Sequence, residues 1–506
     1  MSPNYVDLIN RGGRGAPERE AIVFQDKSLS FAEVHRATNQ LANTFAARGL
    51  AHGDRLGLLV NNGLYSVPLD FACAKAGINR VPLNARLSVP EHARMLEDTG
   101  CTRLVYGPDL AGAAEAIEKA VPGLVCLPLG HEGEGLLGEA AGASDEEPNV
   151  KVAADDVVLT LFTSGTTGTL KAAQHTQASY AAICRNVLLN LIDPVPGDTM
   201  LHAASLIHAS GVFVLPFWLR GARTVIMSQF EPSAYLKAIH EHDVTAINLV
   251  PTMLQMLLGH PDFGAVAGSR LKQVIYGASP MPRPVIEQAM TAWGRERFWQ
   301  YYGQTECPLA VAVLRPEDHE GEALGACGRP ALDVEIRLVD EAGEDVAPGE
   351  PGEIAVRAPS MLAGYHNAPD LNAQMMMGDG WMRTRDLGQF DETGLLYLRD
   401  RTSDMIITGG YNVYPREIED ILMAHPSVAE CAVVGVQDEK WVEAVTAVVA
   451  LKPGETADGD TLTAFVGERV ASYKRPRRVV FVDAIPKTAV GKLNRKAVRD
   501  QLNASD

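Results

Sequence analysis

Short apolar segments alternate with amphipathic segments through the first part of the chain, and this alternation limits the folds that the chain can adopt. Residues 31–49 place apolar side chains at helical spacing and end on a glycine, which predicts an amphipathic helix. Residues 53–62 then predict a short buried strand, residues 68–77 a second helix, and residues 80–84 a second strand. Strands separated by helices favour a largely parallel sheet that helices cover.

The pattern changes twice toward the C-terminus. From about residue 333 the predicted strands are short and separated by turn clusters such as DEAGED and DETG, which indicates a small β-rich subdomain. From Asp404 onward helices and strands alternate again, over enough residues for a separate α+β domain. The predicted fold class is therefore α/β, with a large N-terminal domain of several subdomains, built on covered parallel-type sheets and a β-rich part, and a small α+β C-terminal domain.

Charge and cysteine content exclude several classes of protein. The formal net charge is −18, whereas nucleic-acid binders carry a basic excess, so we predict no nucleic-acid partner. Seven cysteines occur without a C-x-x-C pair, which is typical of a reducing compartment. The N-terminal residues lack the apolar centre of a signal peptide, and no apolar stretch approaches the ~20 residues of a membrane-spanning helix. We expect a cytoplasmic protein without a transmembrane segment.

Residues 162–173, FTSGTTGTLKAA, are the strongest local motif and directly follow a predicted strand. Glycines, hydroxyl side chains and one lysine can surround an anion with backbone N–H groups, hydroxyls and an ammonium. The G-x-x-x-x-G-K-[ST] spacing of a Walker A loop is absent. Taken alone, a run of Ser, Thr and Gly is equally compatible with a surface turn.

Four further motifs follow in order: YGQTE at residues 302–306, WMRTRD at 381–386, DRTSDMIITGGYNVYP at 400–415, and PKTAVGK at 486–492. Together with residues 162–173 they resemble the adenylate-forming superfamily, which includes acyl-CoA synthetases, peptide-synthetase adenylation domains and firefly-type luciferases. Within that superfamily the chain is most similar to the AMP-dependent acyl- and aryl-CoA synthetases.

This resemblance implies an AMP-forming carboxylate–CoA ligase with ATP, Mg²⁺ and coenzyme A as cofactors and a small carboxylic acid as substrate. ATP would convert the acid to an acyl-adenylate with release of pyrophosphate, and CoA would then displace AMP. Two alternatives stay open: an enzyme that loads the acyl-adenylate onto a carrier protein, and a catalytically silent nucleotide-binding regulatory protein. Homodimers are common among such enzymes.

The resemblance also implies the role of individual residues. Lys492 bridges the acyl carboxylate and the phosphate, Thr305 contacts the α-phosphate, and Glu306 binds Mg²⁺. Asp386 accepts the ribose hydroxyls and Tyr302 stacks on adenine. The full set that the resemblance assigns to the nucleotide is Thr163, Ser164, Gly165, Thr166, Thr167, Gly168, Lys171, Gly277, Ala278, Ser279, Tyr302, Asp386 and Arg401.

His208 lies in the region that forms the acyl pocket of these enzymes. Amino-acid-activating relatives place an Asp there to hold the substrate ammonium, so a histidine argues against an α-amino acid. Other predicted pocket walls are small or apolar: Ala209, Gly211, Met253, Tyr301, Leu309 and Ala310. They favour a neutral hydrophobic group on a fatty or aromatic monocarboxylic acid. A satisfied structural histidine is the alternative for His208.

The resemblance divides the chain into an N-terminal domain at residues 1–400, a hinge at 401–404 and a mobile C-terminal domain at 405–506 that carries the catalytic lysine. Ser403 occupies a hinge position that is usually Asp or Lys. Gly409 and Gly410 would line the tunnel for the pantetheine arm of CoA, because glycine has no Cβ to obstruct it.

A run of basic residues and two replacements of usual glycines are three further features of the sequence. Residues 474–478, KRPRR, place four cations in five residues, where they either attract CoA phosphates or form a solvated loop. Arg385 replaces the glycine that usually precedes Asp386, and Val442 replaces a usual glycine in the segment KWVE.

Overall fold

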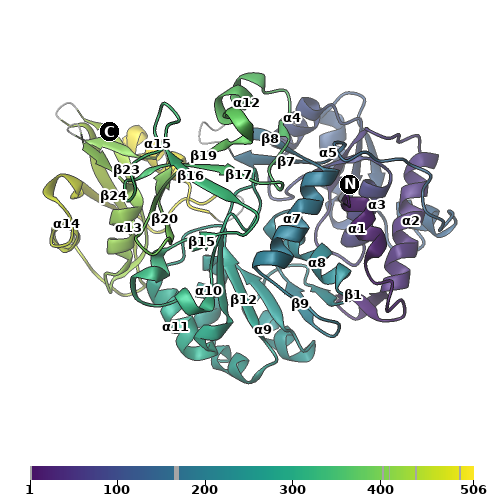
Figure 1. The fold of residues 1–506 in the computed structure, drawn as a ribbon, viewed down its shortest axis with the longest axis horizontal. Coiled ribbons are helices and arrows are strands. Elements are labelled where there is room, and N and C mark those ends of the chain that lie inside the picture. The colour runs from purple at the N-terminus through teal and green to yellow at the C-terminus, as the bar shows by residue number, and fades with distance from the viewer. Residues whose placement is uncertain are drawn as a thin grey trace.

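The computed structural model describes residues 3–164, 170–401, 404–408, 411–438, 441–488 and 492–505. The chain forms a larger lobe, which occupies the centre and right of Figure 1, and a smaller C-terminal lobe in yellow-green on the left. Within the described residues the larger lobe contains sheets of nine, seven and four strands, and the smaller lobe contains one of five.

The seven-stranded sheet has the order β18 (Gly364–Tyr365), β8 (Leu170–Thr176), β7 (Val157–Ser164), β4 (Asn79–Pro82), β3 (Arg55–Leu59), β5 (Arg103–Tyr106) and β6 (Val125–Pro128). Strands β7 to β6 run parallel, whereas β8 and β18 join antiparallel at one edge. One face is covered by α2 (Phe31–Ala47), α3 (Ser66–Lys75) and α6 (Gly135–Ala141), the other by α4 (Val89–Thr99) and α5 (Ala111–Ala120).

Helix α2 shows how local sequence fixes an element. It begins after Ser30, whose side chain accepts a hydrogen bond from the Glu33 amide while the Glu33 carboxylate accepts one from the Ser30 amide. It ends before Gly49, which adopts φ +76°. The predicted helix, strand, helix and strand of residues 31–84 are confirmed as α2, β3, α3 and β4.

The nine-stranded sheet has the order β15 (Arg329–Pro330), β14 (Ala312–Leu314), β13 (Phe298–Tyr302), β12 (Gln273–Gly277), β11 (Ala246–Leu249), β9 (Thr199–His202), β10 (Arg223–Ile226), β1 (Glu20–Phe24) and β2 (Lys27–Ser30). The strands from β13 to β1 are parallel, so their carboxyl ends meet at one edge. Helices α9 (Pro232–Glu241), α10 (Pro251–Leu258) and α11 (Arg283–Trp293) cover one face, and α7 (Gln177–Asn190) and α8 (Val214–Leu219) cover the other. Helix α1 (Tyr5–Arg11) packs against α3, α7 and α8.

The predicted β-rich subdomain is confirmed as an antiparallel sheet. Its order is β16 (Glu335–Val339), β17 (Gly352–Arg357), β19 (Met382–Phe390) and β20 (Leu396–Arg401), and α12 (Pro369–Met375) lies between β17 and β19 in sequence. One apolar core includes Ala173 of β8, Ile275 of β12 and Val356 of β17, so it joins all three sheets of the larger lobe. Apolar burial of this kind is the main driving force that holds layers together.

The smaller lobe has the α+β character that the sequence predicts. Its sheet has the order β22 (Tyr411–Val413), β21 (Ile406–Thr408), β24 (Val442–Leu451) and β23 (Val428–Asp438), and β25 (Arg478–Phe481) runs parallel to β24. Helices α13 (Pro415–Met423) and α14 (Gly459–Gly467) pack on one face and α15 (Arg495–Ser505) on the other. In the part of the chain that the structure describes, no helix is long and apolar enough to cross a membrane.

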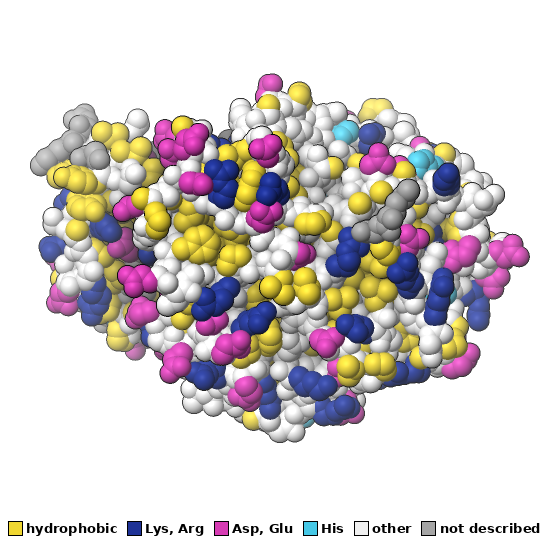
Figure 2. Space-filling model, in the orientation of Figure 1, with side chains coloured by type: hydrophobic (Ala, Val, Ile, Leu, Met, Phe, Trp, Pro, Cys, Tyr) yellow, Lys and Arg dark blue, Asp and Glu magenta, His cyan; other side chains and the backbone are white. Residues whose placement is uncertain are grey.

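Figure 2 shows acidic and basic side chains interspersed over the viewed face of the molecule. Among the described side chains on this face, the basic ones form no continuous surface.

Candidate active site

The carboxyl ends of β12 and β13 lie side by side at one edge of the nine-stranded sheet, where Gly277 pairs with Tyr301. The predicted nucleotide segment Gly277–Ser279 continues from β12, and the segment Tyr302–Glu306 continues from β13. A Cβ on Gly277 would lie 2.4 Å from the Tyr301 carbonyl oxygen, so only glycine allows this approach. Open α/β sheets bind their ligands at the carboxyl ends of the strands, which makes this edge the candidate site.

Tyr302 and Asp386 come from separate motifs and meet in the structure. The Tyr302 hydroxyl donates a 2.6 Å hydrogen bond to Oδ2 of Asp386, in β19. The Gln304 amide donates to the same oxygen and, at 3.0 Å, to the Thr384 carbonyl oxygen. Asp386 is 3% exposed, so these donors stabilise a buried charge. Burial and the Asp386 charge raise the pKa of Tyr302 well above its usual value, which keeps the phenol protonated. Sequence reasoning missed Gln304, although it lies inside the YGQTE motif.

His175, at the end of β8, fixes the position of Thr305. Its Nε2 donates a 2.8 Å hydrogen bond to the Thr305 carbonyl oxygen across 130 residues of sequence. The imidazole is buried, and this burial lowers its pKa to about 4. His175 is therefore a neutral donor at neutral pH. Nothing in the sequence analysis selected it, because a single histidine four residues after Lys171 gives no local signal.

Glu306 is held by Tyr365, another residue that the motifs did not select. The Tyr365 hydroxyl donates a 2.5 Å hydrogen bond to Oε1 of Glu306, and the Leu362 amide donates to the Glu306 carbonyl oxygen at 2.8 Å. The Lys171 ammonium lies 5.8 Å from the centre of the Tyr365 ring. The structure thus brings the predicted Lys171 and Glu306 together around one tyrosine.

The two arms of the predicted phosphate loop form an antiparallel pair. Thr163 lies opposite Lys171, and Ser164 lies opposite Leu170. This pairing holds the two ends of the loop together at the end of β7 and the start of β8. Gly165, Thr166, Thr167 and Gly168 lie outside the described residues.

Lys492 of the smaller lobe acts electrostatically on His208 of the larger lobe. Burial first, and the positive charge of Lys492 second, lower the pKa of His208 to about 4. Lys492 is exposed, and its carbonyl oxygen accepts a 2.7 Å hydrogen bond from the Thr488 amide. Two predicted site residues from different lobes are therefore close enough for one charge to influence the other.

Most of the predicted acyl-pocket residues share one core. Tyr301, Leu309 and Ala310 are buried in the core that joins the three sheets, and Ala209 packs against it. Gly211 lies in the 3₁₀ helix η2 (Ala209–Phe213), where a Cβ would lie 1.9 Å from the Leu206 carbonyl oxygen. Met253 belongs instead to the separate core on the opposite face of the nine-stranded sheet.

The predicted hinge and CoA-tunnel residues are less completely described. Arg401 ends β20 and pairs in register with Asp386. Ser403, Gly409 and Gly410 lie outside the described residues. Beside the hinge, the Arg416 amide donates to Asp400 at 3.0 Å.

The two residues that stand where glycine is usual, Arg385 and Val442, both have a positive φ angle. Arg385 adopts φ +62° and Val442 adopts φ +69°, in the left-handed region that favours glycine. Arg385 donates to the Gln374 side chain in α12 at 3.3 Å, and its amide donates to Glu353 at 3.0 Å.

The basic run at residues 474–478 is partly neutralised within the protein. Lys474 forms a 2.7 Å ion pair with Glu417, and the Arg477 guanidinium lies 4.2 Å from the centre of the Trp441 ring. Arg475 donates to the Gly467 carbonyl oxygen at 3.1 Å.

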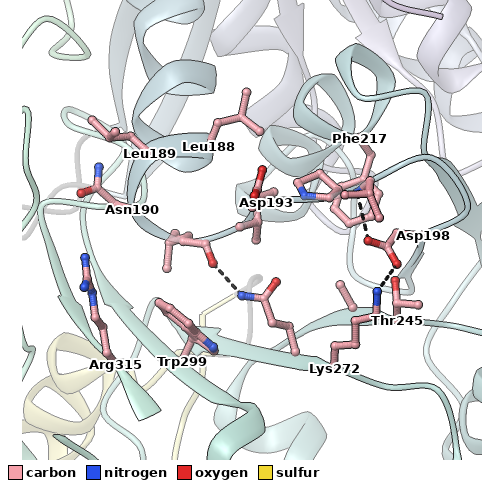
Figure 3. Close-up of a pocket in the computed structure, with 16 residues that line it drawn as sticks. Leu188, Leu189, Asn190, Asp193, Asp198, Phe217, Thr245, Lys272, Trp299 and Arg315 are labelled. Carbon is pink, nitrogen blue, oxygen red and sulfur yellow. Dashed lines mark hydrogen bonds and ion pairs between the residues drawn. The ribbon is translucent and has the colours of Figure 1, made fainter. Parts of the chain in front are cut away.

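A pocket of about 450 Å³ lies elsewhere, at the amino ends of β11 and β12 (Figure 3). It is lined by Leu188, Trp299, Arg315 and their neighbours, and it contains none of the predicted site residues. Lys272, at one side, is paired with Asp198 at 2.7 Å.

Comparison with known proteins shows the family of the chain. The family model for AMP-binding enzymes matches residues 10–366, and the model for the AMP-binding enzyme C-terminal domain matches residues 417–492. The chain is 37% identical to feruloyl-CoA synthase from an Amycolatopsis species, with 97% of both chains covered. It is also 37% identical to medium/long-chain-fatty-acid–CoA ligase FadD8 of Mycobacterium tuberculosis, with 98% of this chain and 90% of the relative covered.

A solved structure of the same family has a similar fold over nearly the whole chain. O-succinylbenzoate coenzyme A synthetase (MenE) from Bacillus subtilis, in complex with AMP, is 31% identical, covers 99% of this chain and 98% of its own, and superposes with a TM-score of 0.85. The chain therefore belongs to the AMP-binding enzymes of the adenylate-forming superfamily, as an AMP-forming acid–thiol ligase that uses ATP, Mg²⁺ and coenzyme A.

Proposed function

We propose that this ligase activates a hydrophobic monocarboxylic acid, either fatty or aromatic. In the first step a carboxylate oxygen of the acid attacks the α-phosphorus of ATP, and the bond to pyrophosphate breaks. In the second step the thiolate of CoA attacks the carbonyl carbon of the acyl-adenylate, and AMP leaves. The products are acyl-CoA, AMP and pyrophosphate.

One observation carries the proposal: Tyr302 and Gln304 of one motif donate hydrogen bonds to Asp386 of another, so the residues expected to bind the nucleotide meet at the carboxyl edge of β13. Burial and then the charge of Lys492 lower the pKa of His208, which belongs to the predicted acyl pocket, and this supports a place for the Lys492 cation near the carboxylate of the acid. In the first step two anionic groups approach each other, and charge builds up on the α-phosphate. We assign Lys492 to that charge. A preorganised donor or cation at such a position contributes about 3–4 kcal/mol to transition-state stability.

Thr305 and Glu306 complete the catalytic group. Thr305 would donate its hydroxyl to the α-phosphate, and the His175 bond to its carbonyl oxygen holds the backbone in place. Glu306 would bind Mg²⁺ together with the phosphates of ATP. In the described chain no group of three or more His, Cys, Asp or Glu side chains could hold a metal ion by itself. One carboxylate plus substrate phosphates suits Mg²⁺, which neutralises phosphate charge when bound.

The nucleotide would lie along the carboxyl edge of β12 and β13. Asp386 would accept the ribose hydroxyls, and its buried carboxylate is already held in place by Tyr302 and Gln304. Tyr302 would stack on adenine beside Gly277–Ser279, Arg401 would donate to the ribose, and the loop from Thr163 to Lys171 would enclose the phosphates.

The chemistry of the acyl pocket supports the proposed class of acid. Tyr301 and Leu309 belong to an apolar core, and Ala209 packs against it. The lowered pKa of His208 keeps its imidazole neutral at neutral pH. A neutral imidazole offers no charge to pair with a second carboxylate or with an ammonium, so neither a dicarboxylate nor an α-amino acid is favoured.

Two lobes joined by a short segment also suit a two-step reaction. We propose that residues 1–400 form the nucleotide- and acid-binding domain, that residues 401–404 act as the hinge, and that residues 405–506 rotate between the steps. Hinges are short segments at the ends of elements that absorb the backbone change. After rotation, Gly409 and Gly410 would admit the pantetheine arm, and the basic residues of 475–478 would face the CoA phosphates.

The test is release of pyrophosphate from ATP with a panel of acids: short, medium and long fatty acids, and substituted benzoates and cinnamates. We expect release with hydrophobic monocarboxylates, none with amino acids or dicarboxylates, and formation of acyl-CoA once CoA is added. Faster turnover with a dicarboxylate would reject the proposed acid class. AMP formation that CoA fails to stimulate would instead indicate a carrier-protein acceptor.

A further inference from the structure

The hydrogen bond between Tyr365 and Glu306 makes the two oxygens of the Glu306 carboxylate unequal as ligands. The Tyr365 hydroxyl lies 2.5 Å from Oε1 of Glu306. Among the described residues no other group donates to this carboxylate. A charge-assisted hydrogen bond of this kind is roughly twice as strong as a neutral one, and it draws electron density from Oε1, so Oε2 is the oxygen favoured for a cation.

The backbone of Tyr365 is held by β8 and by Asn372. In β18 it pairs with Ala173 of β8. Asn372 of α12 then binds both of its backbone groups: the Tyr365 amide donates to Asn372 Oδ1 at 2.7 Å, and Asn372 Nδ2 donates to the Tyr365 carbonyl oxygen at 2.9 Å. The ring is 5% exposed and packs in the core that joins the three sheets. A side chain with so little freedom holds its hydroxyl in one place.

The same ring faces the phosphate-binding side of the site. The Lys171 ammonium lies 5.8 Å from the ring centre. Lys171 pairs with Thr163 across the two arms of the predicted phosphate loop. Tyr365 therefore contacts both the residue proposed for the metal and a residue proposed for the phosphates, while its own hydroxyl is committed to Glu306.

Divalent cations differ in how they use a carboxylate. Mg²⁺ requires near-octahedral geometry with single oxygen ligands at about 2.0–2.1 Å. Ca²⁺ accepts about six to eight oxygens at about 2.3–2.6 Å and often takes both oxygens of one carboxylate. An oxygen that already accepts a hydrogen bond from a fixed phenol is a weaker metal ligand, and the bond also fixes the rotation of the carboxylate, so the other oxygen is favoured for a single metal bond.

We infer that Tyr365 is a positioning residue that presents Glu306 to the metal–ATP complex through a single oxygen and thereby favours Mg²⁺ over Ca²⁺. This inference rests on the proposed role of Glu306. In the proposed site Tyr365 acts through Glu306 and has no assigned contact with the acid or the reacting phosphorus, so its removal should alter metal preference more than the chemical step itself. Loss of a hydrogen-bonding partner behind a metal ligand typically changes metal affinity by ~10–100-fold.

The experiment measures ATP binding by calorimetry in the absence of the acid, with MgCl₂ or with CaCl₂. For each protein the dissociation constant in Ca²⁺ is divided by that in Mg²⁺. We expect Tyr365→Phe to lower this ratio about tenfold. An unchanged ratio in Tyr365→Phe would overturn the inference.

Tyr5→Phe is the matched control. The Tyr5 hydroxyl donates a 2.7 Å hydrogen bond to Asp70, and the side chain is buried, but it lies in α1, outside the proposed site. Tyr5→Phe should keep the wild-type ratio, and an equal drop in both variants would also reject the inference. Should Tyr365→Phe fail to fold, Asn372→Ala loosens the same tyrosine and must shift the ratio in the same direction.

Glu306→Gln separates this inference from the proposed function. If ATP binding in Glu306→Gln still responds to divalent ions as in the wild type, the metal role of Glu306 itself is wrong. If Glu306→Gln loses that response and Tyr365→Phe keeps the wild-type ratio, only the role of Tyr365 is wrong.

Discussion

The Tyr302 hydroxyl lies 2.6 Å from Asp386, and this hydrogen bond joins the end of β13 in the nine-stranded sheet to β19 in the four-stranded sheet. The two residues stand 84 positions apart in sequence. Their contact places the proposed adenine and ribose partners next to each other, so a single nucleoside can reach both.

Asp386→Ala should raise the KM for ATP by about tenfold or more and leave the KM for the acid nearly unchanged. The reason is the loss of charge-assisted hydrogen bonds to the ribose, each worth about 1.5–3 kcal/mol. Steady-state kinetics with one substrate varied at a time check this. Asp345→Ala is the control, because Asp345 forms an exposed ion pair with Arg337 outside the site. An unchanged KM for ATP would reject the ribose assignment.

Lys492→Ala should slow acyl-adenylate formation by ~10²–10³-fold, the scale of one lost transition-state contact. Thioester formation from supplied acyl-adenylate and CoA should remain largely intact, because the proposed role of the lysine belongs to the first step. Single-turnover assays of each half-reaction separate the two. Lys496→Ala removes an exposed lysine four positions further along the chain and should affect neither half-reaction. Equal loss of both in Lys492→Ala would indicate a structural role.

Acid should destabilise the fold between about pH 6.5 and pH 4, because buried histidines resist protonation. Burial lowers the pKa of His175 to about 4 and that of His202 to about 3. In this window the unfolded chain, whose histidines titrate near 6.5, binds more protons than the folded chain, so the free energy of unfolding falls as the pH falls.

Urea unfolding at pH 7.5, 6.5, 5.5 and 4.5 checks this acid sensitivity. His175→Gln should make the unfolding free energy fall less steeply over that window. His240→Gln, at an exposed position of α9, should have the wild-type slope. A steeper slope in His175→Gln would contradict the linkage.

Val442→Gly should stabilise the smaller lobe by about 0.5–1 kcal/mol. Val442 adopts φ +69° and its side chain is 64% exposed, so little packing is lost when it is removed. The left-handed conformation costs an L-residue roughly 1–2 kcal/mol, and the greater unfolded-state entropy of glycine offsets part of the gain. The urea midpoint of the wild type, Val442→Gly and Val442→Ala measures this. Val442→Ala keeps a Cβ, so its urea midpoint should rise less than that of Val442→Gly. A midpoint of Val442→Gly below that of the wild type would contradict the prediction.

Local sequence signals predicted much of the fold. The apolar spacing of residues 31–49 and the glycine at its end predicted α2, and the turn clusters after residue 333 separate the strands of the antiparallel sheet. The ordered motifs also predicted that Tyr302 and Asp386 serve one site. The helix and turn signals can be read from neighbouring residues, and the motifs can be read from their order along the chain.

Contacts between distant segments left no such signal. Tyr365 reaches Glu306 only because β18 pairs with β8, about 190 residues earlier in the chain, and His175 reaches Thr305 by folding alone. The sequence identified Arg385 as unusual, but only the structure shows its positive φ and its contact with Gln374. The division of the larger lobe into separate nine- and seven-stranded sheets likewise depends on long-range pairing.

The core shared by the three sheets of the larger lobe has a practical consequence for engineering. One set of interdigitated side chains packs against all three sheets. Removal of one segment of this lobe would therefore leave the remaining sheets without part of their core. The smaller lobe has cores of its own, and residues 401–404 are the short stretch of chain that we propose as its hinge. Domain exchange among related ligases should therefore succeed when the cut falls at that stretch, and the resulting hybrid should keep the nucleotide and acid preferences of the parent that supplies residues 1–400.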